Sequence, residues 1–154
     1  MNNFSLNKKQ IEEYQKNKDP YLFIDFVDNV IPGVSIEGYK DLSVKEWFFK
    51  VHWPGDPNMP GMLQMEALTQ MSALSILTLA GNKGKIMYLV SAEKLKFKKK
   101  ILPGSRLYIR SKVNKYVRGI ANFSAQGTVD NNLVCSAEIS LILPEEINKY
   151  KKNN

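Results

Sequence analysis

A long stretch in the middle of the chain, from Pro60 to Gly81, has the composition of a helix that is apolar almost all round. Pro60 suits the first turn of a helix, because its missing N–H would be unpaired there and its φ angle is already helical. Gly81 begins a glycine-rich stop. A helix without a polar face either crosses a membrane or is enclosed by the rest of the protein. The apolar positions are Met62, Leu63, Met65, Ala67, Leu68, Met71, Ala73, Leu74, Ile76, Leu77 and Leu79.

The polar residues near the start of this helix argue against a membrane span. Its length of about 20 residues would allow a crossing. However, Glu66 would enter the hydrocarbon region, where an acid costs about 2.5–3.5 kcal/mol, and Gln64, Thr69 and Gln70 lie beside it. We therefore expect a helix that is buried in a globular domain. The chain has 154 residues, of which 44% are hydrophobic and 24% charged, which fits one domain with a substantial core.

The segments on both sides of the central helix show mostly strand patterns. Residues 5–16 are the exception, since they carry one apolar stripe and two candidate caps, Ser5 and Asn7, and predict a short helix within residues 1–18. The last three strands follow one another through short turns and must be antiparallel. An antiparallel sheet wrapped around the central helix, an α+β fold, is the simplest way to bury that helix. The expected strands are 21–31, 34–42, 85–91, 95–101, 106–117, 119–129 and 133–143, within a single domain whose residues 147–154 form a polar, flexible tail.

Three groups near the start of the central helix are suited to proton chemistry. His52 is the only histidine of the chain, and a free imidazole with a pKa near 6.5 can accept a proton at neutral pH. Gly61 leaves a backbone N–H uncovered at the positive end of the helix dipole. Glu66 is the lone acid in the apolar helix. Taken singly, His52 also fits an ordinary hydrogen-bonded histidine, and Glu66 an acid on an exposed helix face.

The run His-Trp-Pro-Gly-Asp-Pro-Asn-Met-Pro-Gly-Met-Leu at residues 52–63, followed by Glu66-Ala67-Leu68 and Gln70, resembles the active-site signature of the beta-hydroxyacyl-acyl-carrier-protein dehydratases. These are hot-dog fold enzymes of bacterial fatty-acid synthesis, and the resemblance extends over most of the chain. It implies a hot-dog fold, with the antiparallel sheet around the long helix. It also implies dehydration of a (3R)-hydroxyacyl thioester of acyl carrier protein to the trans-2-enoyl thioester, in fatty-acid or related acyl biosynthesis.

The resemblance also implies roles for individual residues. His52 takes the α-proton, the Gly61 N–H binds the thioester oxygen, and Glu66 of a neighbouring subunit handles the proton of the departing hydroxyl. The backbone carbonyl of Asn58 holds the second ring nitrogen of His52. The expected assembly is a homodimer with shared active sites, either alone or as a trimer of dimers. No metal and no nucleotide cofactor are expected, because the substrate arrives on the phosphopantetheine arm of acyl carrier protein.

Five apolar side chains are candidates for lining an acyl tunnel: Trp53, Met62, Met65, Leu68 and Phe97. For any one of them, ordinary core packing is the more common role. They are apolar residues in or near the signature, or on the strand that follows the helix. The predicted substrate-binding set comprises Trp53, Asn58, Met62, Met65, Phe97, Lys96 and Lys98.

The chain is basic, with 22 Lys and Arg against 15 Asp and Glu and a net charge of +7. In a strand over residues 94–100, Lys94, Lys96 and Lys98 share one face while Leu95 and Phe97 share the other. This lysine row is either a solvated sheet face or a docking patch for acidic acyl carrier protein or its arm. The lysines do not interleave with exposed aromatic side chains, so we expect no nucleic-acid binding.

The remaining features limit the functional class. Cys135 is the only cysteine and lies in an alternating strand pattern, so we interpret it as a small buried residue in a reducing compartment. The start of the chain lacks the apolar core of a secretory signal, and we expect a cytoplasmic protein. Two other functions stay open: a hot-dog acyl thioesterase, and a non-catalytic protein that binds acyl carrier protein.

Overall fold

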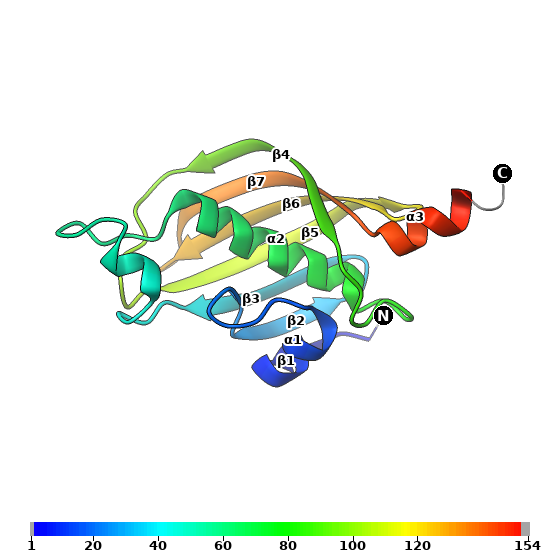
Figure 1. Ribbon diagram of the computed structural model, residues 1–154, viewed down its shortest axis with the longest axis horizontal. Coiled ribbons are helices and arrows are strands. Elements are labelled where there is room, and N and C mark those ends of the chain that lie inside the picture. Colours follow the sequence, from blue (N-terminus) through cyan, green and yellow to red (C-terminus); the bar gives the residue numbers. More distant parts are fainter. Residues whose placement is uncertain (1, 152–154) are drawn as a thin grey trace.

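Helix α2 (Gly61–Leu77) lies across one face of a seven-stranded sheet that curves around it (Figure 1). The computed structural model describes residues 2–151. The strands are arranged in the order β1-β2-β3-β5-β6-β7-β4, and every neighbouring pair is antiparallel. The elements in chain order are β1 (Phe4–Asn7), α1 (Lys8–Tyr14), β2 (Phe26–Ile31), β3 (Ser35–Asp41), the 3-10 turn η1 (Trp47–Lys50), α2, β4 (Tyr88–Phe97), β5 (Arg106–Val117), β6 (Ile120–Val129), β7 (Asn132–Ile142) and α3 (Pro144–Lys151).

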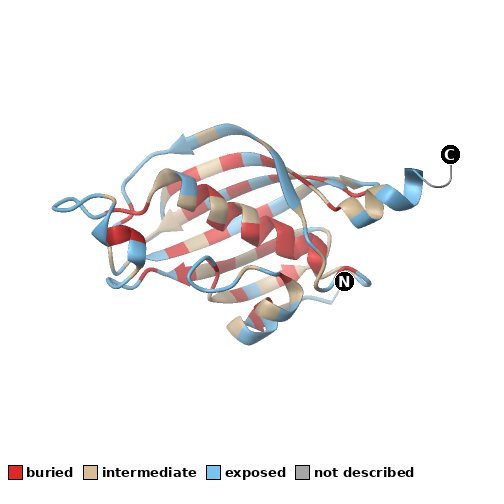
Figure 2. Cartoon of the chain, in the orientation of Figure 1, coloured by how far each residue is buried: buried red, intermediate tan, exposed pale blue. Residues whose placement is uncertain are grey.

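The sheet buries α2 on nearly all sides, as the composition of the helix requires. Strands β3, β5, β6 and β7 contact it, and 12 of its 17 residues are buried (Figure 2). The two buried serines of the helix are hydrogen-bonded. The Ser72 hydroxyl donates to the Leu68 carbonyl and lies 2.7 Å from the Ser111 hydroxyl of β5, and the Ser75 hydroxyl donates to the Ser72 carbonyl. The predicted enclosure of the central helix by an antiparallel sheet is therefore confirmed.

The last three strands form the predicted sequential hairpins. The turn between β5 and β6 consists of Arg118 and Gly119, whose φ angles are 50° and 81°. The turn between β6 and β7 consists of Asp130 and Asn131, with φ angles of 49° and 62°. Two-residue turns with positive φ at both positions match the right-handed twist of the flanking strands.

The N-terminal part of the chain differs from the sequence prediction. The first residues of the expected helix form β1 instead, which pairs with β2. The helix begins only after Asn7, whose side chain accepts from the Gln10 amide and completes a capping box. The expected strand 21–31 was too long, since only its second half is strand β2. Leu22, Phe23 and Ile24 are all buried, which the alternation of a half-buried strand does not permit.

Two further segments differ from the expected elements. The two strands predicted over 85–91 and 95–101 are one strand, β4, with a register irregularity between Glu93 and Lys96 and a positive φ at Lys94. Part of the expected polar tail is helix α3, which extends to Lys151 and has no buried residue. Acidic residues in its first turn and lysines in its last turn complement the helix dipole. Residues 152–154 of the expected tail lie outside the described residues.

We predict that Leu74→Ala lowers the free energy of unfolding by about 2–5 kcal/mol, because Leu74 is fully buried on α2 and its removal leaves a cavity against the sheet. Met62→Ala on the exposed side of the same helix should change it by only about 0.5 kcal/mol. Chemical denaturation of the two variants checks this difference. Equal effects would contradict the burial of α2 described above.

Candidate active site

The loop that carries His52 is held by its own backbone hydrogen bonds. The Asn58 amide donates to the His52 carbonyl, and Trp53 and Asp56 exchange two backbone bonds across a tight turn. His52 Nδ1 lies 3.2 Å from the backbone oxygen of Asn58. A carbonyl oxygen can only accept, so Nδ1 carries the proton of the neutral ring. His52 Nε2 is then left with a lone pair that can take a proton.

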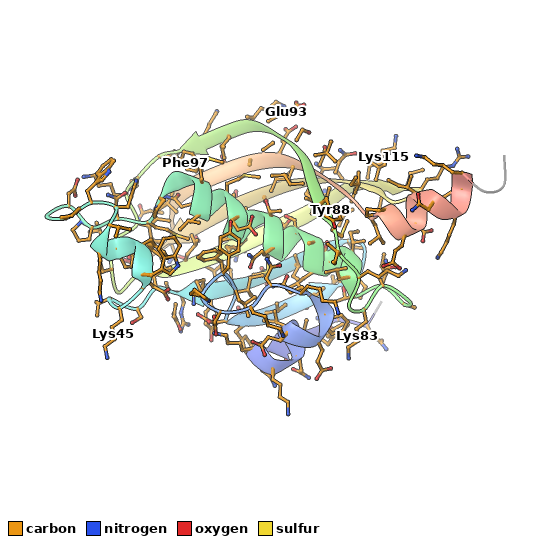
Figure 3. The ribbon with its side chains drawn as sticks, viewed as in Figure 1. Lys45, Lys83, Tyr88, Glu93, Phe97 and Lys115 are labelled. Carbon is orange, nitrogen blue, oxygen red and sulfur yellow. The ribbon has the colours of Figure 1, made fainter. Side chains whose placement is uncertain are left out.

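Gly61 begins helix α2 directly after this loop. The first amides of a helix have no carbonyl partner inside the helix and form its positive end. A Cβ at Gly61 would lie 2.9–3.1 Å from three ring atoms of Phe97, so a larger residue would displace that ring. Phe97 is the last residue of β4, and Figure 3 shows it beside the first turn of α2. The absence of a side chain at position 61 therefore lets an aromatic ring lie close to the helix start.

Glu66 is held by a neighbouring amide on the same helix. The Gln70 side chain donates to Glu66 Oε1 over 2.8 Å. Gln70 is itself bound to the buried coil before β2, since its Nε2 donates to the Tyr21 carbonyl and its Oε1 accepts from the Phe23 amide, each over 2.9 Å. The coil thus fixes Gln70, and Gln70 fixes one oxygen of the partly buried Glu66 carboxyl. The second oxygen, Oε2, is the one free to carry a proton.

Glu66 opens onto a cavity of about 180 Å³. One stripe of α2, Glu66, Thr69, Gln70, Ala73 and Leu77, forms one wall of this cavity. The other walls comprise Gln15, Lys16, Asn17, Lys85, Ile86, Met87, Tyr88, Leu89 and Leu141. His52 is not part of this lining. Within one chain, the structure therefore does not bring His52 and Glu66 into one cavity.

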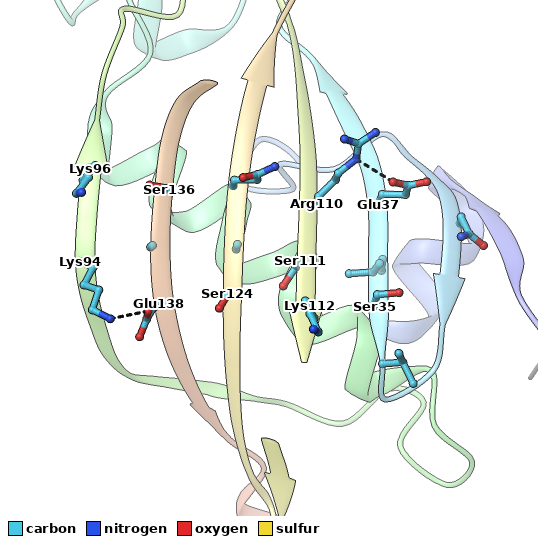
Figure 4. A pocket seen from close by; sticks show the side chains of 16 residues that line it. Ser35, Glu37, Lys94, Lys96, Arg110, Ser111, Lys112, Ser124, Ser136 and Glu138 are labelled. Atoms are coloured by element: carbon cyan, nitrogen blue, oxygen red, sulfur yellow. Dashed lines mark hydrogen bonds and ion pairs between the residues drawn. The ribbon is translucent and has the colours of Figure 1, made fainter. Parts of the chain in front are cut away.

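A larger hollow of about 700 Å³ lies on the outer face of the sheet, away from α2 (Figure 4). Lys94 and Lys96 on β4 line it, and two ion pairs, Lys94 with Glu138 and Arg110 with Glu37, cross its floor. It contains none of the three groups suited to proton chemistry. We therefore locate the chemistry around α2 and not in this hollow.

The structure separates the other predicted site residues into exposed and buried ones. Trp53 and Met62 are more than half exposed, Phe97 is 44% exposed, and Met65 is buried in the core. Leu68 is buried in the core as well. None of these five residues lines the Glu66 cavity in one chain, and their assignment to an acyl tunnel stays a prediction. Lys96 is exposed on β4, and Lys98 is exposed just after the strand ends at Phe97.

Sequence reasoning missed the residues that surround Glu66. The helical spacing of Thr69, Ala73 and Leu77 after Glu66 could have revealed one wall of the cavity, because positions three, four, seven and eleven residues apart share a helix face. The hydrogen bonds of Gln70 to the coil had no sequence signal. They depend on how residues 20–25 fold.

Burial raises the pKa of the Cys135 thiol to about 11, so the thiol is protonated at neutral pH, and its predicted burial is confirmed. Within residues 2–151, no group of three or more His, Cys, Asp or Glu side chains is arranged to hold a metal ion.

Comparison with known proteins places the chain in a family. The profile of the FabA-like domain matches residues 17–138. The 3-hydroxyacyl-[acyl-carrier-protein] dehydratase FabZ of Clostridium novyi is 38% identical over 136 residues, which cover 88% of this chain and 95% of the relative. The FabZ dehydratase of Bacillus licheniformis is 34% identical over 141 residues, covering 92% and 98%. The dehydratase heterocomplex ApeI:P from Xenorhabdus doucetiae matches in fold, with a TM-score of 0.75 over 94% of this chain and 97% of that one at 13% identity.

The sheet, the enclosed helix and these matches define a hot-dog protein with a FabA-like domain, which confirms the predicted fold. The chain belongs to the FabZ family of 3-hydroxyacyl-[acyl-carrier-protein] dehydratases. In the described part of the chain, none of the helices has the length and apolar content that a membrane crossing requires.

The raised pKa of Cys135 predicts a specific pH dependence of stability. As the pH rises through about 9, the ordinary pKa of a thiol, the unfolded chain loses the proton while the folded chain keeps it up to about pH 11. This difference lowers the stability of the folded chain. The free energy of unfolding should therefore fall more steeply from pH 9 to 11 in the wild type than in Cys135→Ala. Denaturant titrations across this range measure both slopes, and parallel slopes would contradict the burial of the thiol.

Proposed function

We propose that this dehydratase removes water from a (3R)-hydroxyacyl thioester of acyl carrier protein and forms the trans-2-enoyl thioester. The observation that carries this proposal is the presence of His52, whose Nδ1 is held by the Asn58 carbonyl, together with the Gly61 amide at the helix start nine residues further along the chain. The reaction needs a base, a donor to the thioester oxygen and an acid, and His52, Gly61 and Glu66 supply them in that order. Neither electrons nor a phosphoryl group are exchanged, so the proposal includes no metal and no nucleotide.

His52 Nε2 acts first and takes the proton from the carbon next to the thioester carbonyl. The electrons of that C–H bond move onto the carbonyl oxygen as an enolate. A positioned base of this kind typically contributes about 10²–10⁴ in rate. The bond from Nδ1 to the Asn58 carbonyl keeps the ring in the tautomer that can act and stabilises the ring once it is charged.

The Gly61 amide stabilises the charge that develops on the thioester oxygen. A backbone donor at a helix start is already oriented, and removing one such donor typically costs about 2.7–4 kcal/mol of transition-state stabilisation. Phe97 lies against Gly61, at the place where a side chain would stand. The enolate then expels the hydroxyl group from the next carbon and forms the double bond.

Glu66 gives a proton to the departing hydroxyl, which leaves as water. The Gln70 amide occupies Oε1, so Oε2 delivers the proton. After the reaction Glu66 lacks one proton and His52 holds one too many, and transfer between them restores the starting state. Gln70 acts as a positioning residue, because it orients the carboxyl without touching the reacting atoms.

We also propose that each site is shared by two copies of the chain. This accounts for the absence of His52 from the Glu66 cavity of its own chain. Strand β4 is an edge strand of the sheet and exposes Tyr88, Leu89 and Val90. An unpaired apolar edge is a template for pairing with another chain. A second copy on this edge would meet the Glu66 cavity, which Tyr88 and Leu89 border, and a two-fold arrangement would form two such sites.

Acyl carrier protein is the partner that we propose for the lysines after β4. Lys98 and Lys99 are exposed, and Lys100 forms an ion pair with Asp56 in the His52 loop. The Met59 amide also donates to the Ile101 carbonyl, so this lysine segment adjoins the loop. An acidic carrier bound here would bring its phosphopantetheine arm to the His52 end of α2. We place this chemistry in the cytoplasm, because cysteines are usually kept reduced there and the chain has a single free cysteine.

We predict that His52→Ala and Glu66→Gln each lower kcat for enoyl formation by about 10²–10⁴, because each removes one proton-transfer group. Absorbance of the enoyl thioester measures dehydration. Release of free thiol, followed in the same assay, measures hydrolysis and detects a thioesterase. Glu145→Gln on the exposed part of α3 is the matched control and should keep full activity. Near-normal turnover by His52→Ala would refute the assigned base.

The shared site predicts complementation between inactive variants. Mixing His52→Ala with Glu66→Gln under conditions that exchange subunits should restore activity, since a hybrid dimer contains one intact site with both groups. Exchange itself is verified with differently tagged copies. Hybrids that form and stay inactive would show that each chain works alone.

A further inference from the structure

The Asn58 carbonyl that holds His52 belongs to a peptide unit that is hydrogen-bonded at both ends. Its oxygen accepts from His52 Nδ1 over 3.2 Å. Its N–H, which is that of Met59, donates to the Ile101 carbonyl over 2.9 Å, and Met59 and Ile101 are both buried in the core. The bond to Ile101 fixes only the N–H side of Met59, so the orientation of the Asn58 carbonyl also depends on what holds the other side of this residue.

Gln64 holds that other side, the carbonyl of Met59. Its Nε2 donates to the Met59 oxygen over 3.0 Å, in a buried hydrogen bond. Gln64 is the fourth residue of α2, and its own backbone amide donates to the Pro60 carbonyl over 3.0 Å. The side chain thus ties the residue after Asn58 to the same helix start that presents the Gly61 amide.

The burial of Gln64 shows which of its two polar groups is in use. The residue is 3% exposed, and its Oε1 is buried without a hydrogen-bond partner within residues 2–151. The Met59 carbonyl can only accept, so the amide must present Nε2 to it. An unpaired buried oxygen costs free energy, which an apolar side chain of similar size would avoid. The bond to the loop that carries His52 is therefore what distinguishes this glutamine from a core leucine.

We propose that Gln64 is a positioning residue for His52. Through the Met59 carbonyl it holds the Asn58 carbonyl where His52 Nδ1 can donate to it. This bond keeps the ring in the tautomer whose Nε2 is free to accept a proton. The same side chain joins the His52 loop to the helix start, so the base and the Gly61 amide keep a fixed relative position. The role rests on the proposed function, in which His52 is the base.

Nitrogen NMR of the imidazole ring tests this role directly, since His52 is the only histidine of the chain. The chemical shifts of the two ring nitrogens show which of them carries the proton. At about pH 9, where an ordinary imidazole is neutral, we expect a ring protonated at Nδ1 in the wild type. In Gln64→Leu a substantial share of the rings should be protonated at Nε2 instead. The same tautomer in both proteins would overturn the proposal.

The dehydration assay gives a second readout. Gln64→Leu should lower kcat by about ten- to a hundredfold, because a displaced base loses its reactive geometry. KM should change by less than about twofold, since the buried Gln64 side chain has almost no surface that could meet the substrate. Gln126→Leu, on the outer face of β6, is the matched control and should keep the wild-type kcat, KM and tautomer. A lower kcat with an unchanged tautomer would show a merely structural role and contradict the proposal.

Combination with His52→Ala separates this proposal from the proposed function. Gln64→Leu should not lower the residual rate of His52→Ala further, because it acts through the ring that this variant lacks. A further tenfold loss would count against Gln64 acting through His52. If the wild type shows no dehydration, the proposed function fails, and the tautomer still decides whether Gln64 positions the ring. If Gln64→Leu fails to fold, Gln64→Met removes the same donor with a side chain of similar shape.

Discussion

The rest of this structure depends on one constraint, which is that its central helix has no polar face and must be buried. Helix α2 must be enclosed, and the sheet encloses it with β3, β5, β6 and β7. The enclosure leaves two places where α2 meets open space: its first turn, at Gly61, and the stripe that begins at Glu66. Both places carry groups of the proposed site. The amide of the first turn has no partner within the helix because it begins the helix, and the stripe lines the cavity together with Tyr88 and Leu89 of β4 and Leu141 of β7.

The sequence predicted the enclosed helix, the two hairpins of the last three strands and the family because these depend on local patterns. The apolar content of α2, the turn residues Arg118 and Gly119, and the run from His52 to Leu63 are all readable without long-range contacts. The N-terminal region was less predictable. Leu22, Phe23 and Ile24 have strand-like side chains, but Gln70, 47 residues or more further along, takes the backbone groups on which a ladder would depend.

The residues of the proposed site also divide into those that local patterns indicate and those that depend on long-range contacts. His52, Gly61 and Glu66 were found from residue type and spacing. The group that orients Glu66 was not, since Gln70 takes its partners from the coil before β2. A glutamine has no sequence signature for the partners that it binds, and they are known only when its neighbours have been placed.

The contact between Phe97 and Gly61 joins an edge of the sheet to the start of the helix. Strand β4 ends with Phe97, so in the proposed dimer a chain that pairs along β4 would act on a ring that lies against Gly61. Quaternary structure would thereby be linked to the group that we propose binds the thioester oxygen. A newly made, solitary subunit would be poorly organised for turnover, and assembly itself would act as the step that matures the enzyme.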